Sequence, residues 1–216
     1  ITLTSSCFSA PIILYTKSKT PIYFIHSNEP KIVDINVITR AGSAYDGNKY
    51  GLAKLTHSLM RAGNSKLNAN KINNQLQAYG AHLDGFTTRS SSVWHLRSLA
   101  DKKDLNYSIT VLNTILSKPE FNTIDIKSYK TRQKSAILQS HNKPGELLSL
   151  NIARHLYKST PLAHSTLGTI KGVNGIYRKN ILKFYKQYYV KNNIELAVVG
   201  SINKQQALEI ADKCLK

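Results

Sequence analysis

Acidic side chains are scarce in this sequence. Only 12 Asp and Glu stand against 30 Lys and Arg among 216 residues, which gives a formal net charge of +18. Such a charge is typical of proteins that meet nucleic acid, an anionic membrane surface or an acidic partner. The basic residues are spread along the whole chain, and the densest group resembles a solvated helix face: Lys127, Lys130, Arg132 and Lys134. We therefore interpret the charge as a basic surface, or as the complement of an acidic partner subunit, and do not expect nucleic-acid binding.

Long apolar runs are also missing, and cysteine is rare. The longest apolar stretches, such as Pro11–Tyr15, have the length of a strand, whereas a membrane-spanning helix needs roughly 18 residues or more. Cys7 and Cys214 lie at opposite ends of the chain; a disulfide between them is an open alternative, and two cysteines do not define the redox compartment. The chain begins at Ile1 without signal-peptide features, so we expect either that a targeting segment has been removed or that the chain has been trimmed.

The residues that are present predict a folded α+β domain. Hydrophobic residues make up 41% of the chain, more than disordered segments carry, and the length allows a sizeable core. Val33, Ile35 and Val37 alternate with polar residues, which predicts a strand with one buried face. From Gly51 to Gly63 the apolar residues instead recur at helical spacing, and Gly63 stands where a helix commonly ends.

Similar patterns predict the remaining elements. Asp101 and Asn122 can each cap a helix, and Pro144 suits the first turn of another. Residues 158–172 are interpreted as a loop, and we find no internal repeat and no linker. The further strands are expected at 12–15, 22–25, 82–88, 92–99 and 194–199, and the helices at 69–79, 101–116, 122–139, 144–156, 175–189 and 203–215. One domain over residues 1–216 is the simplest organisation.

A series of short motifs matches one protein family in order and spacing. A strand ends in an A-G-S-x-x-D turn, a glycine-led helix follows, and an F-x-x-x-Y-Y segment precedes a final L-A-V-V-G strand. The motifs are Ala41–Asp46, Gly51–Ala53, Gly63, Gly80-Ala81, Pro119–Phe121, Pro161 with Gly168, Phe184–Tyr189 and Leu196–Gly200. On these residues the chain resembles the pitrilysin/insulinase (inverzincin) family of zinc metallopeptidases, specifically its N-terminal domain.

The resemblance extends over nearly the whole chain and implies the fold. It implies a metallopeptidase-like α+β domain in which a mostly antiparallel sheet of about six strands packs against several helices. The family is built from repeated domains of about this size, so we expect a second, similar domain that is missing from this chain.

The catalytic motif of the family is replaced in this sequence. Active members carry H-x-x-E-H on the helix that here begins at Gly51; the two histidines bind zinc and the glutamate polarises a zinc-bound water. The five positions are Lys54-Leu55-Thr56-His57-Ser58. An ammonium has no lone pair for zinc and a serine hydroxyl is a poor ligand. The third ligand would fall near Lys134 and Ala136, and Phe121–Gly145 contains no glutamate. We therefore expect no catalytic residue, no bound metal and no cofactor.

Other kinds of site have little support in the sequence. The seven histidines (26, 57, 82, 95, 141, 155 and 164) include no H-x-x-x-H pair. An enzyme rebuilt around His57, with His82 or His141 as a partner in space, remains an alternative to a structural role. There is no G-x-S-x-G motif and no phosphate-binding loop, and Cys7 has no recognisable histidine partner for thiol catalysis.

The resemblance also implies a role without catalysis. Silent and active chains of this family often pair around a chamber that takes unfolded peptides, as in bacterial heterodimers and, by related schemes, in the mitochondrial processing peptidase and the core subunits of the bc1 complex. We expect a non-catalytic subunit beside an active H-x-x-E-H partner; the alternative is a stand-alone structural or binding module. Bacterial pairs are usually exported, so a periplasmic location is expected, with a mitochondrial relative as the alternative.

One strand is a candidate for peptide binding. Extended peptides add to an exposed sheet edge through main-chain hydrogen bonds, which requires no zinc. The corresponding segment comprises Leu83, Asp84, Gly85, Phe86 and Thr87. The alternative for this segment is an ordinary edge strand, in which Asp84 and Gly85 limit aggregation.

Overall fold

A six-stranded sheet with helices packed against it forms the structure, a computed structural model that describes residues 10–215. Most of the helices, within residues 102–188, lie between the fifth and the sixth strand of the chain. The strands are β1 (Ile12–Tyr15), β2 (Pro21–His26), β3 (Ile32–Thr39), β4 (His82–Thr87), β5 (Ser92–Leu99) and β6 (Ile194–Gly200). The helices are α1 (Leu52–Met60), α2 (Ala69–Ala78), α3 (Lys102–Ser117), α4 (Thr123–Ser140), α5 (Pro144–Leu156), α6 (Ile170–Asn174), α7 (Arg178–Tyr188) and α8 (Lys204–Cys214), with 3-10 turns at Ser43–Tyr45 and Lys191–Asn193.

The sheet confirms the predicted fold class. Its strand order is β1-β2-β6-β3-β5-β4, and every neighbouring pair is antiparallel except β2 with β6. The last strand of the chain, β6, therefore lies between two of the first three. β4 occupies the edge opposite β1, so the segment proposed for peptide binding lies on an edge strand.

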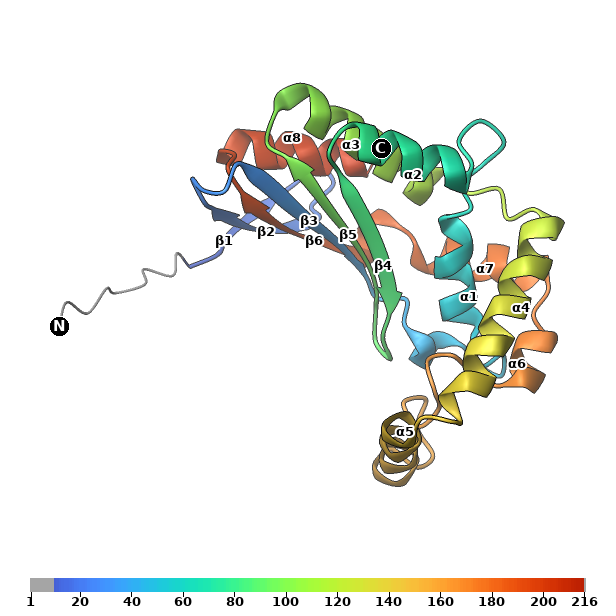
Figure 1. Cartoon of the computed structure of the whole chain (residues 1–216). Helices are drawn as coiled ribbons and strands as arrows, with labels where there is room; N and C mark the ends of the chain where they lie inside the picture. The colour runs from blue at the N-terminus through green and yellow to red at the C-terminus, as the bar shows by residue number, and fades with distance from the viewer. Residues whose placement is uncertain (1–9, 216) are drawn as a thin grey trace.

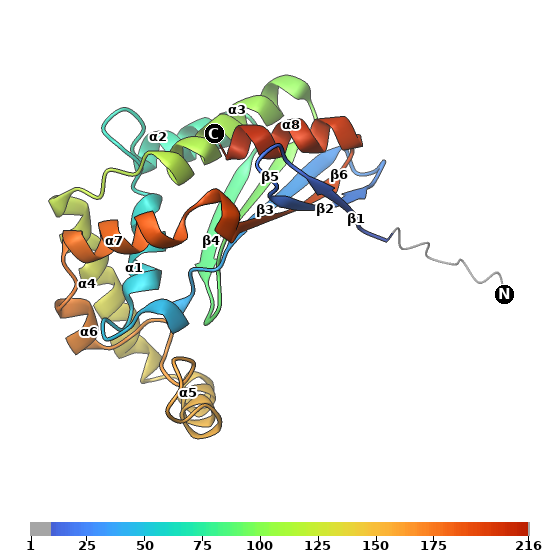
Figure 2. The same cartoon turned by 180° about the vertical axis from the view of Figure 1, so that it is seen from behind.

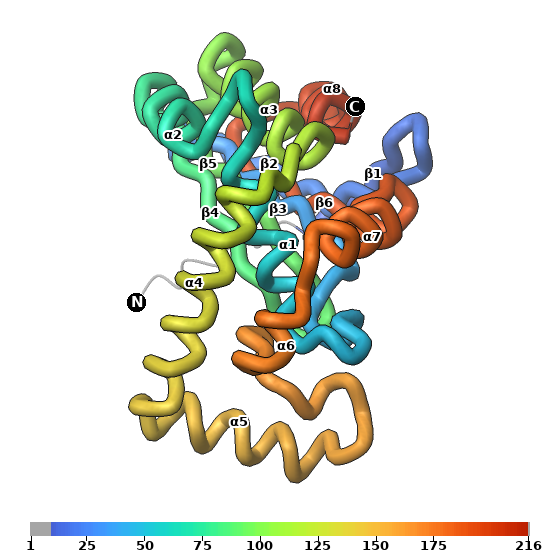
Figure 3. The backbone as a smooth tube through the Cα atoms, turned by 90° about the vertical axis from the view of Figure 1, so that its right-hand side faces the viewer, coloured from blue at the N-terminus to red at the C-terminus, as the bar shows by residue number. Residues whose placement is uncertain are grey.

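One face of the sheet carries the core. Val33, Ile35 and Val37 of β3 are fully buried, as their alternation with polar residues predicts. Helices α2, α3 and α8 lie along this face, with α3 beside α8, while α1, α4 and α7 gather at the β4 end (Figures 1 and 2). Helix α5 projects beyond α4 and α6 at one end of the molecule (Figure 3), and Ala153 is its one buried residue.

Helix α1 is held at its N-terminus by a buried carboxylate. Asp46 accepts hydrogen bonds from the backbone N–H groups of Gly51 (2.6 Å) and Ala53 (2.7 Å), which have no partner inside the helix. The side-chain amide of Gln133, from α4, donates to the carbonyl oxygens of Gly51 (3.0 Å) and Leu167 (2.8 Å). The A-G-S-x-x-D turn and the loop that ends at Gly168 thus both fix the position of α1.

Two details differ from the sequence-based predictions. The loop predicted over residues 158–172 ends in a short helix, because residues 170–174 form α6. The Thr169 hydroxyl starts this helix by accepting a hydrogen bond from the N–H of Gly172 (3.0 Å). The helix predicted from Gly175 begins at Arg178 instead, since Gly175 ends α6.

Cys7 lies outside the described residues, so the Cys7–Cys214 pairing is not tested. None of the helices between residues 10 and 215 is long and apolar enough to cross a membrane.

Candidate functional site

The positions of the lost motif lie on α1, with their side chains in different surroundings. Lys54 and Ser58 are half-buried, whereas His57 is only 1% exposed. Burial lowers the pKa of the Lys54 ammonium below its ordinary value. The helix therefore presents an ammonium, an imidazole and a hydroxyl at these three positions.

His57 is wedged between α1 and the sheet. Its ring packs on the indole of Trp94 with a centroid distance of 4.2 Å, and its Nδ1 lies 3.5 Å from the hydroxyl of Tyr189. Its Nε2 has no hydrogen-bond partner among the described residues. That nitrogen faces Gly85 of β4, where an added Cβ would lie only 2.5 Å away. Gly85 thus allows the edge strand to approach the helix, and the two predicted sets of site residues meet at this contact.

Electrostatics keep the His57 imidazole neutral. Burial first, and the positive charge of Lys54 second, lower its pKa from 6.5 to about 3. A neutral imidazole could in principle ligate a metal, but its free nitrogen is directed at the strand and a cation lies beside it. The structural role expected for His57 accounts for these contacts.

Removing the His57 imidazole should make the free energy of unfolding depend less on pH between pH 7 and pH 5. The unfolded histidine takes up a proton near pH 6.5, whereas the folded one stays neutral down to about pH 3. The unfolded state therefore binds more protons in this window, and stability falls as the pH drops through it. Between pH 7 and pH 5 the wild type should lose about 2 kcal/mol more than His57→Leu. Urea unfolding at both pH values measures this, with the exposed His82→Gln as the control; equal losses in wild type and His57→Leu would contradict it.

The edge strand β4 carries the residues predicted to bind peptide. Within the described chain it pairs only with β5, in a register that sets Gly85 opposite Trp94 and Asp84 opposite His95. Leu83 is buried in the core, while Asp84 and Phe86 are exposed on the other face. Thr87 ends the strand and is half-buried. The geometry places all five residues at an open edge, and their binding of a peptide stays a prediction.

A hollow of about 550 Å³ opens between α1, α2, α4 and this edge. His57, Gly85 and Trp94 form its wall on the sheet side. Two arginines that the sequence analysis did not single out as site residues, Arg61 and Arg132, line it from the helix side. The other residues around it are Ser58, Ala62, Asn68, Ala69, Asn70, Asn73, Asp125, Ser128 and Tyr129.

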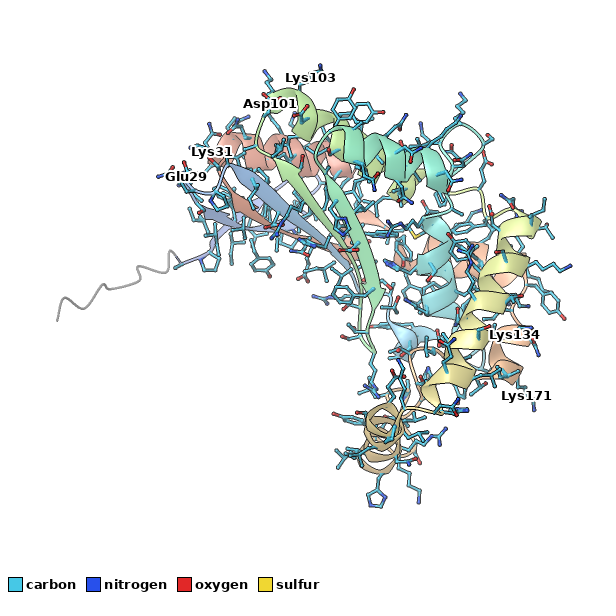
Figure 4. All side chains as sticks on the ribbon, in the orientation of Figure 1. Glu29, Lys31, Asp101, Lys103, Lys134 and Lys171 are labelled. Atoms are coloured by element: carbon cyan, nitrogen blue, oxygen red, sulfur yellow. The ribbon has the colours of Figure 1, made fainter. Side chains whose placement is uncertain are left out.

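Helix α4 carries the position where the third ligand would fall in active members. Lys134 lines a separate hollow together with Lys127 and Lys130, and neither Lys134 nor Ala136 borders the site. Figure 4 shows Lys134 with Lys171 at the α4–α6 end of the molecule. Tyr129 and Arg132, nearly one helical turn apart, occupy the side of α4 that faces the site. Ala136, four residues after Arg132, shares this side of α4, whereas Lys134 lies on another side.

The site does not fit a zinc ion. His82 is exposed on β4, where its Nε2 lies 2.8 Å from Asp84, and His141 follows the end of α4; neither borders the hollow that His57 lines. No group of three or more His, Cys, Asp or Glu residues within 10–215 is arranged to hold a metal ion. Lys54, Arg61 and Arg132 instead place positive charge around the site, which would repel a dication.

Fold and site together define a metallopeptidase-like domain whose α1 helix and surroundings offer cations in place of metal ligands. The family models give the same class. Residues 22–170 match the model described as Insulinase (Peptidase family M16), and residues 175–216 match the model described as Peptidase M16 inactive domain. The chain belongs to the insulinase family, peptidase family M16.

Similar proteins include one named as a non-peptidase and one named as a protease. The chain is 25% identical over 205 residues to the "Non-peptidase homolog YmxG" of Helicobacter pylori, which covers 95% of this chain and 45% of that protein. It is 23% identical over 202 residues to an "Uncharacterized zinc protease" of Rickettsia bellii, covering 92% of this chain and 48% of that protein. The chain spans about half the length of these relatives. The non-peptidase relative and the M16 inactive-domain model support a non-catalytic peptidase homologue.

Solved structures show the same fold. A peptidase M16 inactive domain from Pseudomonas fluorescens superposes with a TM-score of 0.90 at 24% sequence identity. The match covers 95% of this chain and 50% of that one. The metallopeptidase-like domain fold predicted from the short motifs is thereby confirmed.

Proposed function

We propose that this chain is a non-catalytic subunit of a heterodimeric zinc metallopeptidase. It forms part of the wall of a peptide-binding chamber beside an active subunit that carries H-x-x-E-H. One observation carries the proposal: α1, which in active members bears the zinc ligands, here presents the ammonium of Lys54, the buried neutral imidazole of His57 and the hydroxyl of Ser58. Because the fold around this helix is intact, loss of the ligands leaves the surface of the domain available for binding.

The edge strand supports a binding role. β4 has one unpaired side within the described chain, and main-chain groups on such a side can pair with an extended peptide. Gly85 holds this edge against α1, so a peptide added to β4 would pass directly over the former catalytic position. As part of the same proposal, the net charge of +18 attracts an acidic partner subunit or an acidic peptide.

Zinc analysis and a cleavage assay test the absence of catalysis. The purified chain, dialysed against zinc and then against buffer, should retain no stoichiometric zinc and should leave a quenched fluorescent peptide uncut. An active H-x-x-E-H family member, treated identically, is the control and should retain zinc and cleave. Stoichiometric zinc with turnover by this chain would overturn the proposal.

Co-expression tests the partnership. The full-length protein should form an equimolar complex with an H-x-x-E-H family member from the same genome, and peptide cleavage by that member should rise when the complex forms. If it associates with no such chain, the stand-alone structural or binding module is the better account.

The wider organisation is proposed on the same basis. We place residues 1–216 in one domain and a second, similar domain elsewhere in the full-length protein, in line with relatives about twice as long. Zinc is confined to the active partner, and no cofactor is assigned to this chain. Bacterial pairs of this family are usually exported, so the proposed location is the periplasm.

A further inference from the structure

The hollow beside α1 has an excess of positive charge. Arg61 and Arg132 line it, and neither guanidinium forms an ion pair with any described residue. Arg61 donates one hydrogen bond, from Nη2 to the side-chain oxygen of Asn73 (3.1 Å). Arg132 lies over the ring of Tyr129, 5.2 Å from its centroid. Most of their donors are therefore available to an added acceptor.

One carboxylate borders the hollow, and it is already engaged. Asp125 stands in the first turn of α4, where the helix dipole favours a negative charge. Its carboxylate accepts a hydrogen bond from the side-chain amide of Asn122, the residue that caps the helix. Asp125 thus offsets one of the two guanidinium charges at most, and the hollow keeps a net positive charge.

The sheet-side wall adds polar groups that lack partners. Nε2 of His57 and Nε1 of Trp94 are buried and make no hydrogen bond within residues 10–215. The indole nitrogen can only donate. Buried polar groups are ordinarily satisfied, but Nε2 of His57 is directed at Gly85 rather than into the hollow. The two guanidinium groups are therefore the donors that the hollow offers to a ligand.

The position of β4 relates the hollow to an extended peptide. Gly85 borders the hollow and faces the helices, as does its cross-strand partner Trp94. A strand added to the β4 edge would direct every second side chain to this same face. His57 and Trp94 fill the space that a Cβ at position 85 would take. No side chain of β4 at this position therefore stands between an added strand and Arg61 or Arg132.

We propose that the hollow binds a carboxylate of the peptide that pairs with β4, supplied either by an acidic side chain or by the peptide C-terminus. This inference rests on the proposed peptide-binding role and names the class of peptide. A planar guanidinium matches a carboxylate with two parallel hydrogen bonds, and such charge-assisted bonds are about twice as strong as neutral ones. The volume of about 550 Å³ is ample for a carboxylate side chain and its water. The former catalytic position has thus become an anion-binding subsite.

Matched peptides test this subsite. The probes are three fluorescent peptides of alternating threonine and valine: one with a central glutamate and an amidated C-terminus, one with glutamine in its place, and the glutamine peptide with a free C-terminal carboxylate. Anisotropy titrations with the whole chain should give a Kd about tenfold lower for at least one carboxylate peptide than for the amidated glutamine peptide. The peptide that gains affinity identifies the source of the carboxylate.

Variants of the arginines separate this subsite from a general effect of charge. Arg61→Gln and Arg132→Gln should each reduce the tenfold preference to threefold or less, while the affinity for the amidated glutamine peptide stays unchanged. Lys134→Gln removes the same charge from the other face of α4 and should keep the preference.

The outcomes distinguish the two proposals. Equal affinity for all three peptides, or a preference that survives both arginine substitutions, would overturn the carboxylate subsite and leave the peptide-binding function standing. If none of the three peptides binds, the peptide-binding role fails, and the subsite fails with it.

Discussion

Replacing Asp46 with alanine should lower the free energy of unfolding by about 3–5 kcal/mol, because it removes a buried charge that three donors share. The side chain of Asp46 is fully buried. It accepts from the N–H groups of Gly51 and Ala53, and its Oδ2 lies 3.2 Å from Nε2 of His164. Alanine would leave the two backbone donors at the start of α1 without an acceptor in a place that water does not reach.

Urea unfolding, followed by circular dichroism, measures this loss. Asp101→Ala is the control, since Asp101 also accepts backbone N–H groups at a helix start, from Lys103 (2.8 Å) and Asp104 (3.3 Å), but at the surface. That substitution should cost about 1 kcal/mol. Asp46→Asn should fall between the two, because its amide oxygen still accepts one bond. Equal losses for Asp46→Ala and Asp101→Ala would show that burial of this carboxylate is irrelevant.

Gly168→Ala is expected to be similarly severe, with a loss of about 3–5 kcal/mol from backbone strain and overpacking together. Gly168 has a φ of +80°, which disfavours any side chain. A Cβ there would lie 2.2 Å from the carbonyl oxygen of Tyr50 and 2.4 Å from the nitrogen of Gly51. Both contacts are with the backbone that leads into α1, so neither can yield by a change of rotamer.

Gly145→Ala provides the matched control for this substitution. Gly145 lies in α5, where an added Cβ meets nothing within 4 Å. There alanine should raise stability by about 0.5–1 kcal/mol, because it restricts the unfolded chain and suits a helix. Thermal and urea unfolding of both variants would measure the difference. A Gly168→Ala protein as stable as Gly145→Ala would contradict the packing of this loop against α1.

Local signals in the sequence were sufficient to predict most of the helices and strands. Asp101 and Asn122 cap α3 and α4 as predicted, and Pro144 stands in the first turn of α5. These signals act over three or four residues, so a single sequence contains them. The break between α6 and α7 was missed because Thr169 and Gly175 define a helix of five residues, too short for an apolar period to develop.

The site was predictable only in part, because it is assembled from separate elements. Helical spacing placed Lys54, His57 and Ser58 on α1 correctly. Arg61 and Arg132 were missed as a pair, since they lie on different helices and only the packing of α1 against α4 brings both to one hollow. The period of α4, counted from Tyr129, includes Arg132 and Ala136 but not Lys134.

The placement of β6 bears on how the chain reaches its native state. Ile22 of β2 pairs with Leu196 of β6, and the same strand pairs with β3 on its other side. Until residues near 200 have been synthesised, the β1–β2 hairpin and the β3–β5–β4 sheet have no strand to join them, and each exposes an edge that can pair wrongly. Closing such distant contacts is slow compared with forming helices. During synthesis this domain should therefore depend on a chaperone until its final strand has been made.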